Sequence, residues 1–319
     1  MKSSAPERSA RRRARRDRLA RRRLAAAALL LAAVILAILA VTGKDGARRA
    51  PTASVTAGAA GHGAAARAAP RRSGSPRSSS RAGEEAVESP EIRRLIALGQ
   101  PIYCAGHRGN EIALTFDDGP GQYTWLAIPK LRRHGIKATF FIVGRNIPLL
   151  PRALVEERAL GAVGDHTFTH PLLTSLPAGE AESQIVRTQH AVERASGGPV
   201  FLFRPPYGAL DAAIDGIARA NNLLPIMWTV DSRDSLGANY AEIERNVIEG
   251  LYPGAIILMH ENHGQTIRAM LSIFAAIQRR HLRTVSVPKL LTDDPPSEAQ
   301  VKAGGSGCGV LFRPGTGGS

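Results

Sequence analysis

The chain has 319 residues, a formal net charge of +15 and a sequence pI near 10.9. Residues 1–23 carry +9 and residues 44–99 carry +5, whereas residues 100–319 hold 21 basic and 20 acidic side chains and are close to neutral. A nucleic-acid-binding protein normally carries its basic patch on the folded domain, so this distribution excludes that class of partner. The chain has only two cysteines, which excludes zinc-finger and iron–sulfur patterns.

Residues 24–41 form an uncharged apolar run that follows three consecutive arginines. As a helix this run would be ~27 Å long, enough to cross a bilayer core. The positive-inside rule predicts that residues 1–23 stay cytoplasmic and that the rest of the chain is extracytoplasmic, attached to the cell membrane by a single pass. The alternative is a cleaved signal peptide and a secreted protein. We favour the uncleaved anchor, because an h-region usually spans ~7–15 residues and ends in a small-x-small site.

The next segment, residues 42–98, is dominated by Ala, Gly, Ser, Pro and Arg. Such a composition buries too little apolar surface to offset the entropy of ordering, and it predicts a disordered linker. A domain is expected over residues 99–295. A Gly-rich tail, residues 296–319, completes the predicted organisation.

A short apolar run, Ile112–Phe116, stops at two adjacent carboxylates, Asp117 and Asp118, which Gly119-Pro120 follow. The run predicts a buried strand. Asp, Gly and Pro are also the commonest turn residues, so an ordinary turn is the alternative interpretation. Two acids at the tip of a buried strand are costly unless a cation meets them, and a metal ion is such a cation.

Apolar runs alternate with helical patterns through the rest of the domain. Helices are expected at 124–134, 149–160, 178–195, 210–221, 240–250 and 266–280, and strands at 112–116, 138–143, 162–164, 201–203, 224–228, 255–259 and 284–285. This alternation predicts parallel strands joined by right-handed crossovers, in a barrel or a doubly wound sheet.

Polar clusters follow these strands: Asp117-Asp118, His166 and His170, Arg204 to Tyr207, Asp231 and Asp234, and His260. In a (β/α) barrel all such strand ends meet at one face, where barrel enzymes place their active sites. The positions of the clusters therefore favour the barrel.

His166 and His170 are four residues apart, a spacing that brings both imidazoles to one side of a helical turn. With a carboxylate they would form a three-ligand site that leaves room for water, as catalytic zinc sites do. A His pair alone is weak evidence, because histidines are also common on solvated surfaces. Together with Asp117 and Asp118 the pair predicts a metal centre.

The chain resembles the polysaccharide deacetylases, carbohydrate esterase family four, over about residues 100–291. The segments that carry the resemblance are Thr115–Pro120, His166–His170, Arg204–Gly208, Trp228–Asp234 and Leu258–His260, in that order, with Gly135–Phe141 on the second strand. The resemblance implies a deformed (β/α) barrel of about seven parallel strands. It also implies metal-dependent removal of N-acetyl groups from a polysaccharide.

By matching positions, the resemblance implies that Asp118, His166 and His170 hold a divalent ion, Zn²⁺ first, with Co²⁺ or another divalent ion as alternatives. It further implies that Asp117 is the general base and His260 the general acid.

Three other residues are expected to assist these groups. The backbone N–H of Tyr207 would stabilise the oxyanion. Arg204 would keep Asp117 ionised and oriented, and Asp234 would orient and partly charge His260. The family often has Trp directly after the acid at position 234, and this chain has Ser235. The shape of the acyl pocket is therefore expected to differ.

Cys104 and Cys308 flank the predicted domain. An exported domain meets an oxidising environment, and we predict a disulfide between them that ties down the tail. Two unpaired buried thiols are the alternative.

The leading hypothesis is a monomeric, membrane-anchored deacetylase that acts on N-acetylglucosamine of peptidoglycan. Enzyme alternatives are O-deacetylation of acetyl-xylan and deacetylation of chitooligosaccharides. A non-catalytic glycan-binding barrel is the alternative from another class.

Overall fold

The structure, a computed structural model, describes residues 88–309. The predicted cytoplasmic segment (1–23), the predicted transmembrane helix (24–41) and most of the predicted linker lie outside the described residues and stay predictions. Between residues 88 and 309, no helix has both the length and the hydrophobicity to cross a membrane.

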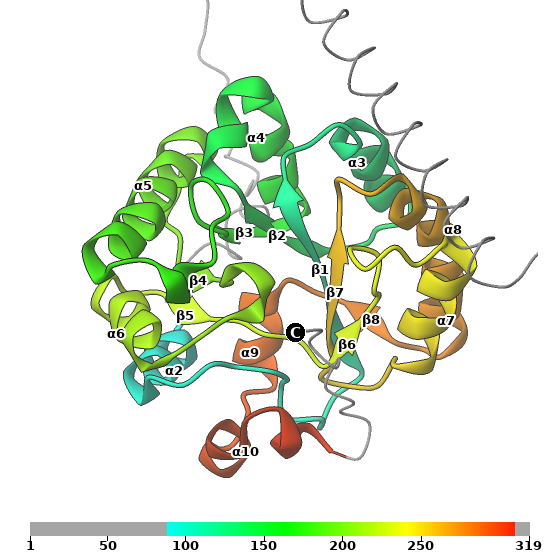
Figure 1. Cartoon of the computed structure of the whole chain (residues 1–319). Coiled ribbons are helices and arrows are strands. Elements are labelled where there is room, and N and C mark those ends of the chain that lie inside the picture. Colours follow the sequence, from blue (N-terminus) through cyan, green and yellow to red (C-terminus); the bar gives the residue numbers. More distant parts are fainter. Residues whose placement is uncertain (1–87, 310–319) are drawn as a thin grey trace, which may run out of the picture. The chain divides into compact units, whose positions relative to one another are not determined.

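A curled sheet of parallel strands forms the centre of the described domain (Figure 1). Seven strands follow one another in the order β5-β4-β3-β2-β1-β7-β6, and β8 pairs with β1 beside this path. The predicted deformed (β/α) barrel is confirmed. The strands are β1 (Glu111–Gly119), β2 (Ala138–Ile142), β3 (Gly161–Asp165), β4 (Leu202–Phe203), β5 (Leu224–Pro225), β6 (Val230–Asp231), β7 (Ile256–His260) and β8 (Arg283–Thr284).

The central strands β1, β2, β3 and β7 are buried almost throughout. Buried parallel strands read as continuous apolar runs because helices cover their outer face. Phe116 on β1 stacks on Phe140 on β2, with ring centroids 5.6 Å apart. Both belong to the larger of two apolar cores. These strands therefore provide a rigid support for the residues that follow them.

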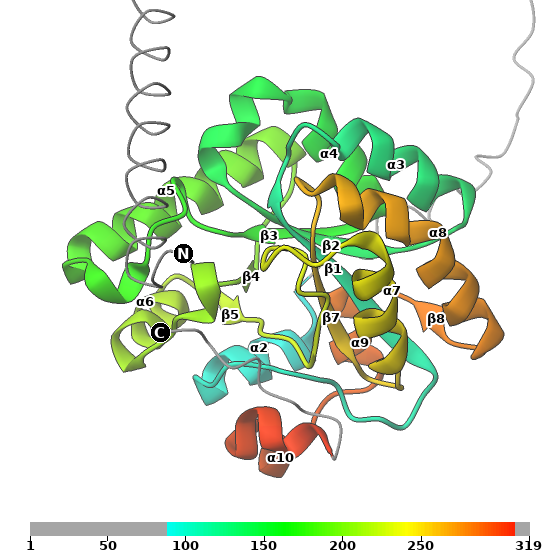
Figure 2. The same ribbon diagram turned by 45° about the vertical axis from the view of Figure 1, so that its right-hand side comes forward.

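Helices surround the sheet, as Figures 1 and 2 show. The predicted helices are confirmed with bounds that shift by a few residues. The layer consists of α3 (Thr124–Arg133), α4 (Pro151–Leu160), α5 (Ala178–Ser196), α6 (Ala212–Ala220), α7 (Tyr240–Glu249) and α8 (Gly264–Arg279), with the short 3₁₀ helices η2 (Gly144–Leu149), η3 (Leu173–Ser175) and η4 (Pro206–Gly208).

Three further helices lie in the lower half of Figures 1 and 2, with α10 at the bottom. They are α2 (Pro90–Leu98), α9 (Val287–Asp293) and α10 (Glu298–Ala303), which the 3₁₀ helix η5 (Gly304–Cys308) follows. Residues of α2, α9 and α10 bury side chains in a second apolar core with Phe141 and Ile226.

The expected disorder of residues 42–98 is wrong at its C-terminal end. Helix α2 begins with Ser89 as N-cap and Pro90 at its first turn, and Gly99 ends it in a left-handed conformation with φ of 60°. Ile92, Leu95 and Ile96 are buried, which stabilises this helix because amphipathic packing supplies most helical stability in proteins.

The predicted strand at 224–228 is also wrong in its extent. Strand β5 ends at Pro225, and a separate strand, β6, pairs with β7. Strands β5 and β6 are the two ends of the sheet path, so the chain between them spans the open side of the barrel.

The buried guanidinium of Arg204 braces this crossing segment. Its Nε donates to the carbonyl of Ile226 at 2.9 Å and its Nη2 to that of Met227 at 3.1 Å. Arg204 thus donates hydrogen bonds to two backbone carbonyls in the segment between β5 and β6.

Candidate active site

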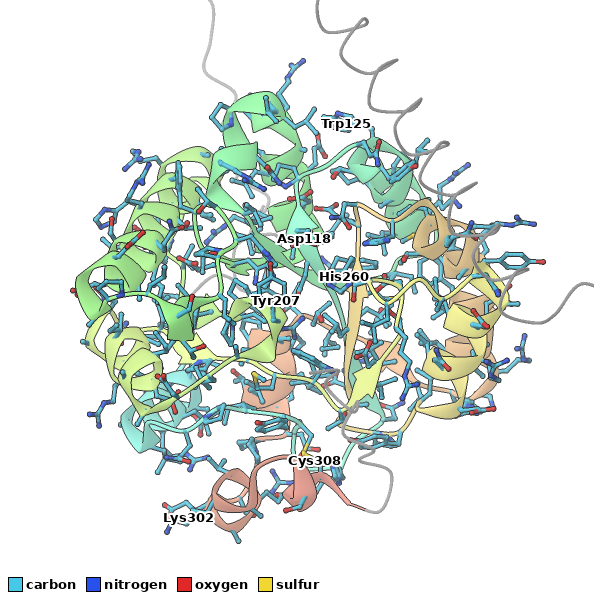
Figure 3. All side chains as sticks on the ribbon, viewed as in Figure 1. Asp118, Trp125, Tyr207, His260, Lys302 and Cys308 are labelled. Atoms are coloured by element: carbon cyan, nitrogen blue, oxygen red, sulfur yellow. A yellow bond between two sulfur atoms is a disulfide. The ribbon has the colours of Figure 1, made fainter. Side chains whose placement is uncertain are left out.

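Five strands deliver their polar residues to one rim of the barrel, as the sequence predicts. Asp117 on β1 is paired in register with His260 on β7. Figure 3 shows Asp118, Tyr207 and His260 around the middle of the sheet, whereas Cys308 lies at the edge occupied by α10. The candidate active site is therefore built where parallel strands end, as in other barrels.

Asp118, His166 and His170 form a three-residue cluster that fits a metal ion. One ligand atom from each lies within 4.8 Å of the other two. Oδ1 of Asp118 is 3.3 Å from Nε2 of His170 and 3.7 Å from Nε2 of His166. Tetrahedral ligands with bonds of about 2.0–2.1 Å would be about 3.3–3.4 Å apart. The donor set and these two distances fit a site for a divalent metal ion.

The imidazole of His166 is held in the form that binds metal. Its Nδ1 lies 2.7 Å from the carbonyl oxygen of Arg204, so Nδ1 carries the proton and Nε2 is left as an acceptor. Burial lowers the pKa of His166 well below its ordinary value. The ring is therefore neutral at neutral pH, as a metal ligand must be.

The expected helical turn between the two histidines is wrong. Thr167 and His170 have φ of 66° and 63°, so the segment is a loop. Oε1 of Gln184 on α5 accepts hydrogen bonds from the backbone N–H groups of Phe168 and Thr169 at 3.1 and 2.9 Å. The loop still brings the two rings together, with centroids 4.8 Å apart.

Asp117 lies beside this cluster and is 2 % exposed. Its Oδ2 is 3.7 Å from Nε2 of His166, and its Oδ1 accepts a hydrogen bond from Nη1 of Arg204 at 2.8 Å. Burial raises the pKa of Asp117 above its ordinary value, and the charge and hydrogen bond of Arg204 act against this rise. Arg204 acts in the expected direction, but in this structure burial outweighs it.

His260 and Asp234 form a second buried pair on the same rim. Nδ1 of His260 is 2.7 Å from Oδ1 of Asp234, and the backbone N–H of His260 donates to Oδ2 at 2.7 Å. Burial alone lowers the pKa of His260, but the hydrogen bond and charge of Asp234 outweigh it and raise that pKa to about 9. The imidazolium is therefore stable at neutral pH, so His260 can donate a proton.

Tyr207 lies beside the metal cluster on the 3₁₀ helix η4, with φ of 62°. Its ring packs edge-on against His170, with centroids 4.8 Å apart, and 70 % of the residue is exposed. Ser235, at the position where the family often has Trp, donates its backbone N–H to Asp234 at 2.8 Å. A serine there leaves no aromatic wall at that position.

Cys104 and Cys308 form a disulfide bond in the structure. The predicted Gly-rich tail is partly helical, because α10 and η5 precede this bond. The disulfide fastens these elements to the segment before β1, at a distance from the rim (Figure 3).

Several buried polar residues around the site are not predicted from the sequence. Glu261 follows His260 directly, is fully buried, and accepts a hydrogen bond from Thr124 at 2.8 Å. It fills the space where a Cβ at Gly119 would lie, so only glycine fits at that turn. Glu157 on α4 is also fully buried. Asn262 donates to the carboxylate of Asp118.

The fold and the site define a (β/α) barrel with a candidate metal site at its rim, and the comparisons identify its family. Residues 105–225 match the polysaccharide deacetylase family. A peptidoglycan-N-acetylglucosamine deacetylase of Bacillus cereus is 32 % identical over 186 residues, which are 56 % of this chain and 68 % of that protein. The chain belongs to the polysaccharide deacetylase family.

Of two further relatives, one is named for the same substrate and one for a different substrate. Peptidoglycan-N-acetylglucosamine deacetylase PgdA of Listeria monocytogenes is 35 % identical, and the match covers 56 % of this chain but only 38 % of that protein. A chitooligosaccharide deacetylase of Azorhizobium caulinodans is 32 % identical and is matched over 100 % of its length and 61 % of this chain.

Solved structures of the family are similar in fold. The chitin deacetylase of Colletotrichum lindemuthianum has a TM-score of 0.58 at 27 % identity, covering 62 % of this chain and 93 % of that one. A pseudoenzyme of carbohydrate esterase family 4 from Bacillus anthracis has a TM-score of 0.57 at 29 % identity, covering 61 % and 69 %. Family membership alone therefore does not establish turnover, which depends on the residues at the rim.

Proposed function

We propose that the chain hydrolyses N-acetyl groups of a cell-wall polysaccharide, with N-acetylglucosamine of peptidoglycan as the substrate. One observation carries the proposal: a buried carboxylate, Asp117, lies beside a three-ligand cluster, and His260, paired with Asp234, lies on the neighbouring strand. Glycan binding alone requires neither a base nor an acid, whereas amide hydrolysis requires both.

Asp118, His166 and His170 would hold the divalent ion, for which we propose Zn²⁺ with Co²⁺ as a substitute. Two imidazoles and one carboxylate are a common ligand set of catalytic zinc. Bound there, the ion supplies a Lewis acid that polarises the acyl carbonyl and acidifies the attacking water.

Asp117 is placed to remove a proton from that water. It is adjacent to Asp118 in sequence, but one of its oxygens is engaged by Arg204, which fixes the orientation of the carboxylate. The other oxygen faces the ligand cluster. A base that is already held in this orientation needs no rearrangement before it accepts the proton.

His260 is placed to protonate the departing amine. An amine is a poor leaving group until it gains a proton, and a protonated imidazole fixed by a carboxylate supplies one. The backbone N–H of Tyr207 would donate to the oxyanion of the tetrahedral intermediate. Each proton transfer thus has a named donor or acceptor in this chain.

The relatives named as peptidoglycan deacetylases support the substrate, as does the predicted membrane anchor at residues 24–41, which would hold the domain beside the wall. We propose a monomer with its catalytic domain outside the cytoplasm. The relative named as a chitooligosaccharide deacetylase supports the first alternative substrate.

The test is acetate release by the zinc-loaded protein from muropeptides, chitooligosaccharides and acetyl-xylan. We expect the fastest release from muropeptides. Faster release from chitooligosaccharides would favour that substrate, and activity on acetyl-xylan alone would contradict N-deacetylation.

The similarity to a pseudoenzyme supports a second candidate, a barrel that binds glycan without turnover. Retention of muropeptide without acetate release, by protein shown to contain metal, would favour it. The complete set of Asp117, Asp118, His166, His170 and His260 supports the enzyme instead.

A further inference from the structure

The two oxygens of the Asp118 carboxylate have different neighbours. Oδ1 faces the imidazoles of His166 and His170. Oδ2 accepts a hydrogen bond from Nδ2 of Asn262 at 3.1 Å. One oxygen is thus directed to the ligand cluster, and the other is taken by an amide of the protein.

The orientation of this amide follows from charge. An amide oxygen turned toward Asp118 would meet a carboxylate oxygen, and two acceptors repel. With Nδ2 toward Asp118, the Oδ1 of Asn262 is buried and has no hydrogen-bond partner among the described residues. The bond to Asp118 is therefore the one side-chain hydrogen bond that the structure records for Asn262.

The position of Asn262 is fixed by its neighbours. It directly follows Glu261, whose backbone N–H donates to the carbonyl of Asp117 at 3.3 Å and whose side chain is held by Thr124. Because the preceding residue, Glu261, is buried and hydrogen-bonded, the amide of Asn262 loses little entropy when it bonds to Asp118.

Asp118 itself is in a left-handed conformation, with φ of 70°. Nδ2 of Asn146 donates to its backbone carbonyl at 3.1 Å, on the opposite part of the residue from Asn262. Asn146 thus holds the main chain, and Asn262 holds the side chain. Among residues 88–309, the hydrogen bond from Asn262 is the one side-chain hydrogen bond recorded to the carboxylate of Asp118.

We infer that Asn262 is a positioning residue that commits Oδ1 of Asp118 to the metal and thereby sets the metal affinity of the site. The hydrogen bond leaves one oxygen for the ion and reduces the rotation of the carboxylate. Because Asn262 is two residues after His260, the same loop links the proposed acid to a proposed ligand.

The experiment measures Zn²⁺ and Co²⁺ dissociation constants by chelator competition for three variants of the protein. Asn262→Leu keeps the approximate shape and removes the donor, whereas Asn262→Gln keeps a donor on a longer side chain. Asn110→Ala is the matched control, since its amide also makes one side-chain hydrogen bond, to His281 at 3.0 Å, but beside the opposite end of β1.

We expect Asn262→Leu to weaken binding of both ions by about 10–100-fold, the usual effect of losing a partner of a metal ligand. Asn262→Gln should recover part of this loss, and Asn110→Ala should match the wild type. The visible spectrum of the Co²⁺ protein should change in Asn262→Leu and not in Asn110→Ala.

Unchanged affinity and an unchanged Co²⁺ spectrum in Asn262→Leu would overturn the inference, as would an equal loss in Asn110→Ala. None of these measurements uses a glycan, so the result is independent of the proposed reaction. In the acetate assay, saturating metal should restore Asn262→Leu if its defect is in metal binding. A loss that excess metal does not restore would point to the His260 loop instead and contradict the inference.

Discussion

Nη1 of Arg204 lies 2.8 Å from Oδ1 of Asp117, and both side chains are buried. The same guanidinium also donates to Thr115 at 2.7 Å and packs over the ring of Phe141 at 4.2 Å from its centroid. Arg204 therefore has two tasks. Its charge pairs with the carboxylate of the proposed base, and its hydrogen bonds hold the segment that spans the open side of the barrel. Loss of this one side chain should affect stability as well as activity.

Replacement of Arg204 by Met should destabilise the domain by about 3–5 kcal/mol, because it leaves a buried carboxylate without its partner. Urea unfolding followed by circular dichroism measures the effect. Arg187→Met, an exposed arginine over Phe168, is the control and should stay within about 0.5 kcal/mol of the wild type. Equal stability of the two variants would contradict the structural task of Arg204.

Asp117→Asn should keep metal binding and lose acetate release. The amide has nearly the shape of the carboxylate but cannot accept the proton, and Asp118, His166 and His170 remain in place. We expect a decrease in kcat of about 10²–10⁴-fold, the usual contribution of a general base, with unchanged metal content by elemental analysis. Turnover at the wild-type rate would exclude Asp117 as the base.

The pKa of His260, raised to about 9 by Asp234, predicts the alkaline limit of activity. The reaction needs the protonated imidazole, so activity should fall as the pH rises through about 9. Asp234→Asn removes the negative charge, while burial still lowers the pKa of His260. The alkaline decline of kcat/KM should then move to lower pH by about two units.

Two controls accompany this pH profile. Asp231→Asn removes an acid that interacts with His260 through its charge, but whose Oδ1 accepts from the backbone of Arg233 instead of from His260. Its decline should therefore move less than that of Asp234→Asn. Titration of His260 followed by NMR gives the same pKa without substrate. An unshifted decline in Asp234→Asn would rule out His260 as the acid that limits the rate.

Glu157 and Glu261 predict a pH dependence of stability. Burial raises the pKa of both carboxyl groups, that of Glu261 to about 7. The charge of Glu261 adds to the rise at Glu157, whereas the hydrogen bond from Glu157 lowers the pKa of Glu261. An acid whose pKa is raised on folding stabilises the protein below its unfolded-state pKa and loses this contribution as the pH rises through the folded-state value. The free energy of unfolding should therefore fall between about pH 4.3 and neutral pH.

Glu157→Gln removes one of these titrations and supplies an N–H donor for Glu261. Its free energy of unfolding relative to the wild type, measured by urea unfolding at each pH, should rise as the pH increases from 5 to 8, by about 1.4 kcal/mol for each unit of pKa shift removed. Glu156→Gln, which changes a surface acid paired with Arg132, is the control. Parallel pH curves for Glu157→Gln and the wild type would show that the buried pair does not titrate in this range.

Local patterns in the sequence predict most of the sheet and its surrounding helices. Helix α5 is expected at 178–195 and occupies Ala178–Ser196, because its apolar side chains recur with helical spacing. Helix α2 has a comparable signal, Ser89-Pro90 at its start and Gly99 at its end, but the polar composition around it obscures this signal. A two-residue strand such as β6 has no pattern in the sequence that could predict it, because its pairing with β7 is what defines it as a strand.

The proposed metal ligands and proton-transfer groups are predictable because they follow predicted strands. The shape of the loop from His166 to His170 is not, because Gln184 on another element determines it. Glu157 is also unpredictable, since an acid on an amphipathic helix normally faces solvent. The roles of Asn262 and Glu261 depend on contacts with β1 and α3 that no local pattern reveals.

The disulfide between Cys104 and Cys308, 204 residues apart in sequence, makes the barrel a covalently closed ring. A protease that cuts one rim loop, such as the one at the exposed Leu236, would leave two pieces that stay joined. Such a nick would be invisible on non-reducing gels, and the strands on both sides of the cut would remain tethered to their partners.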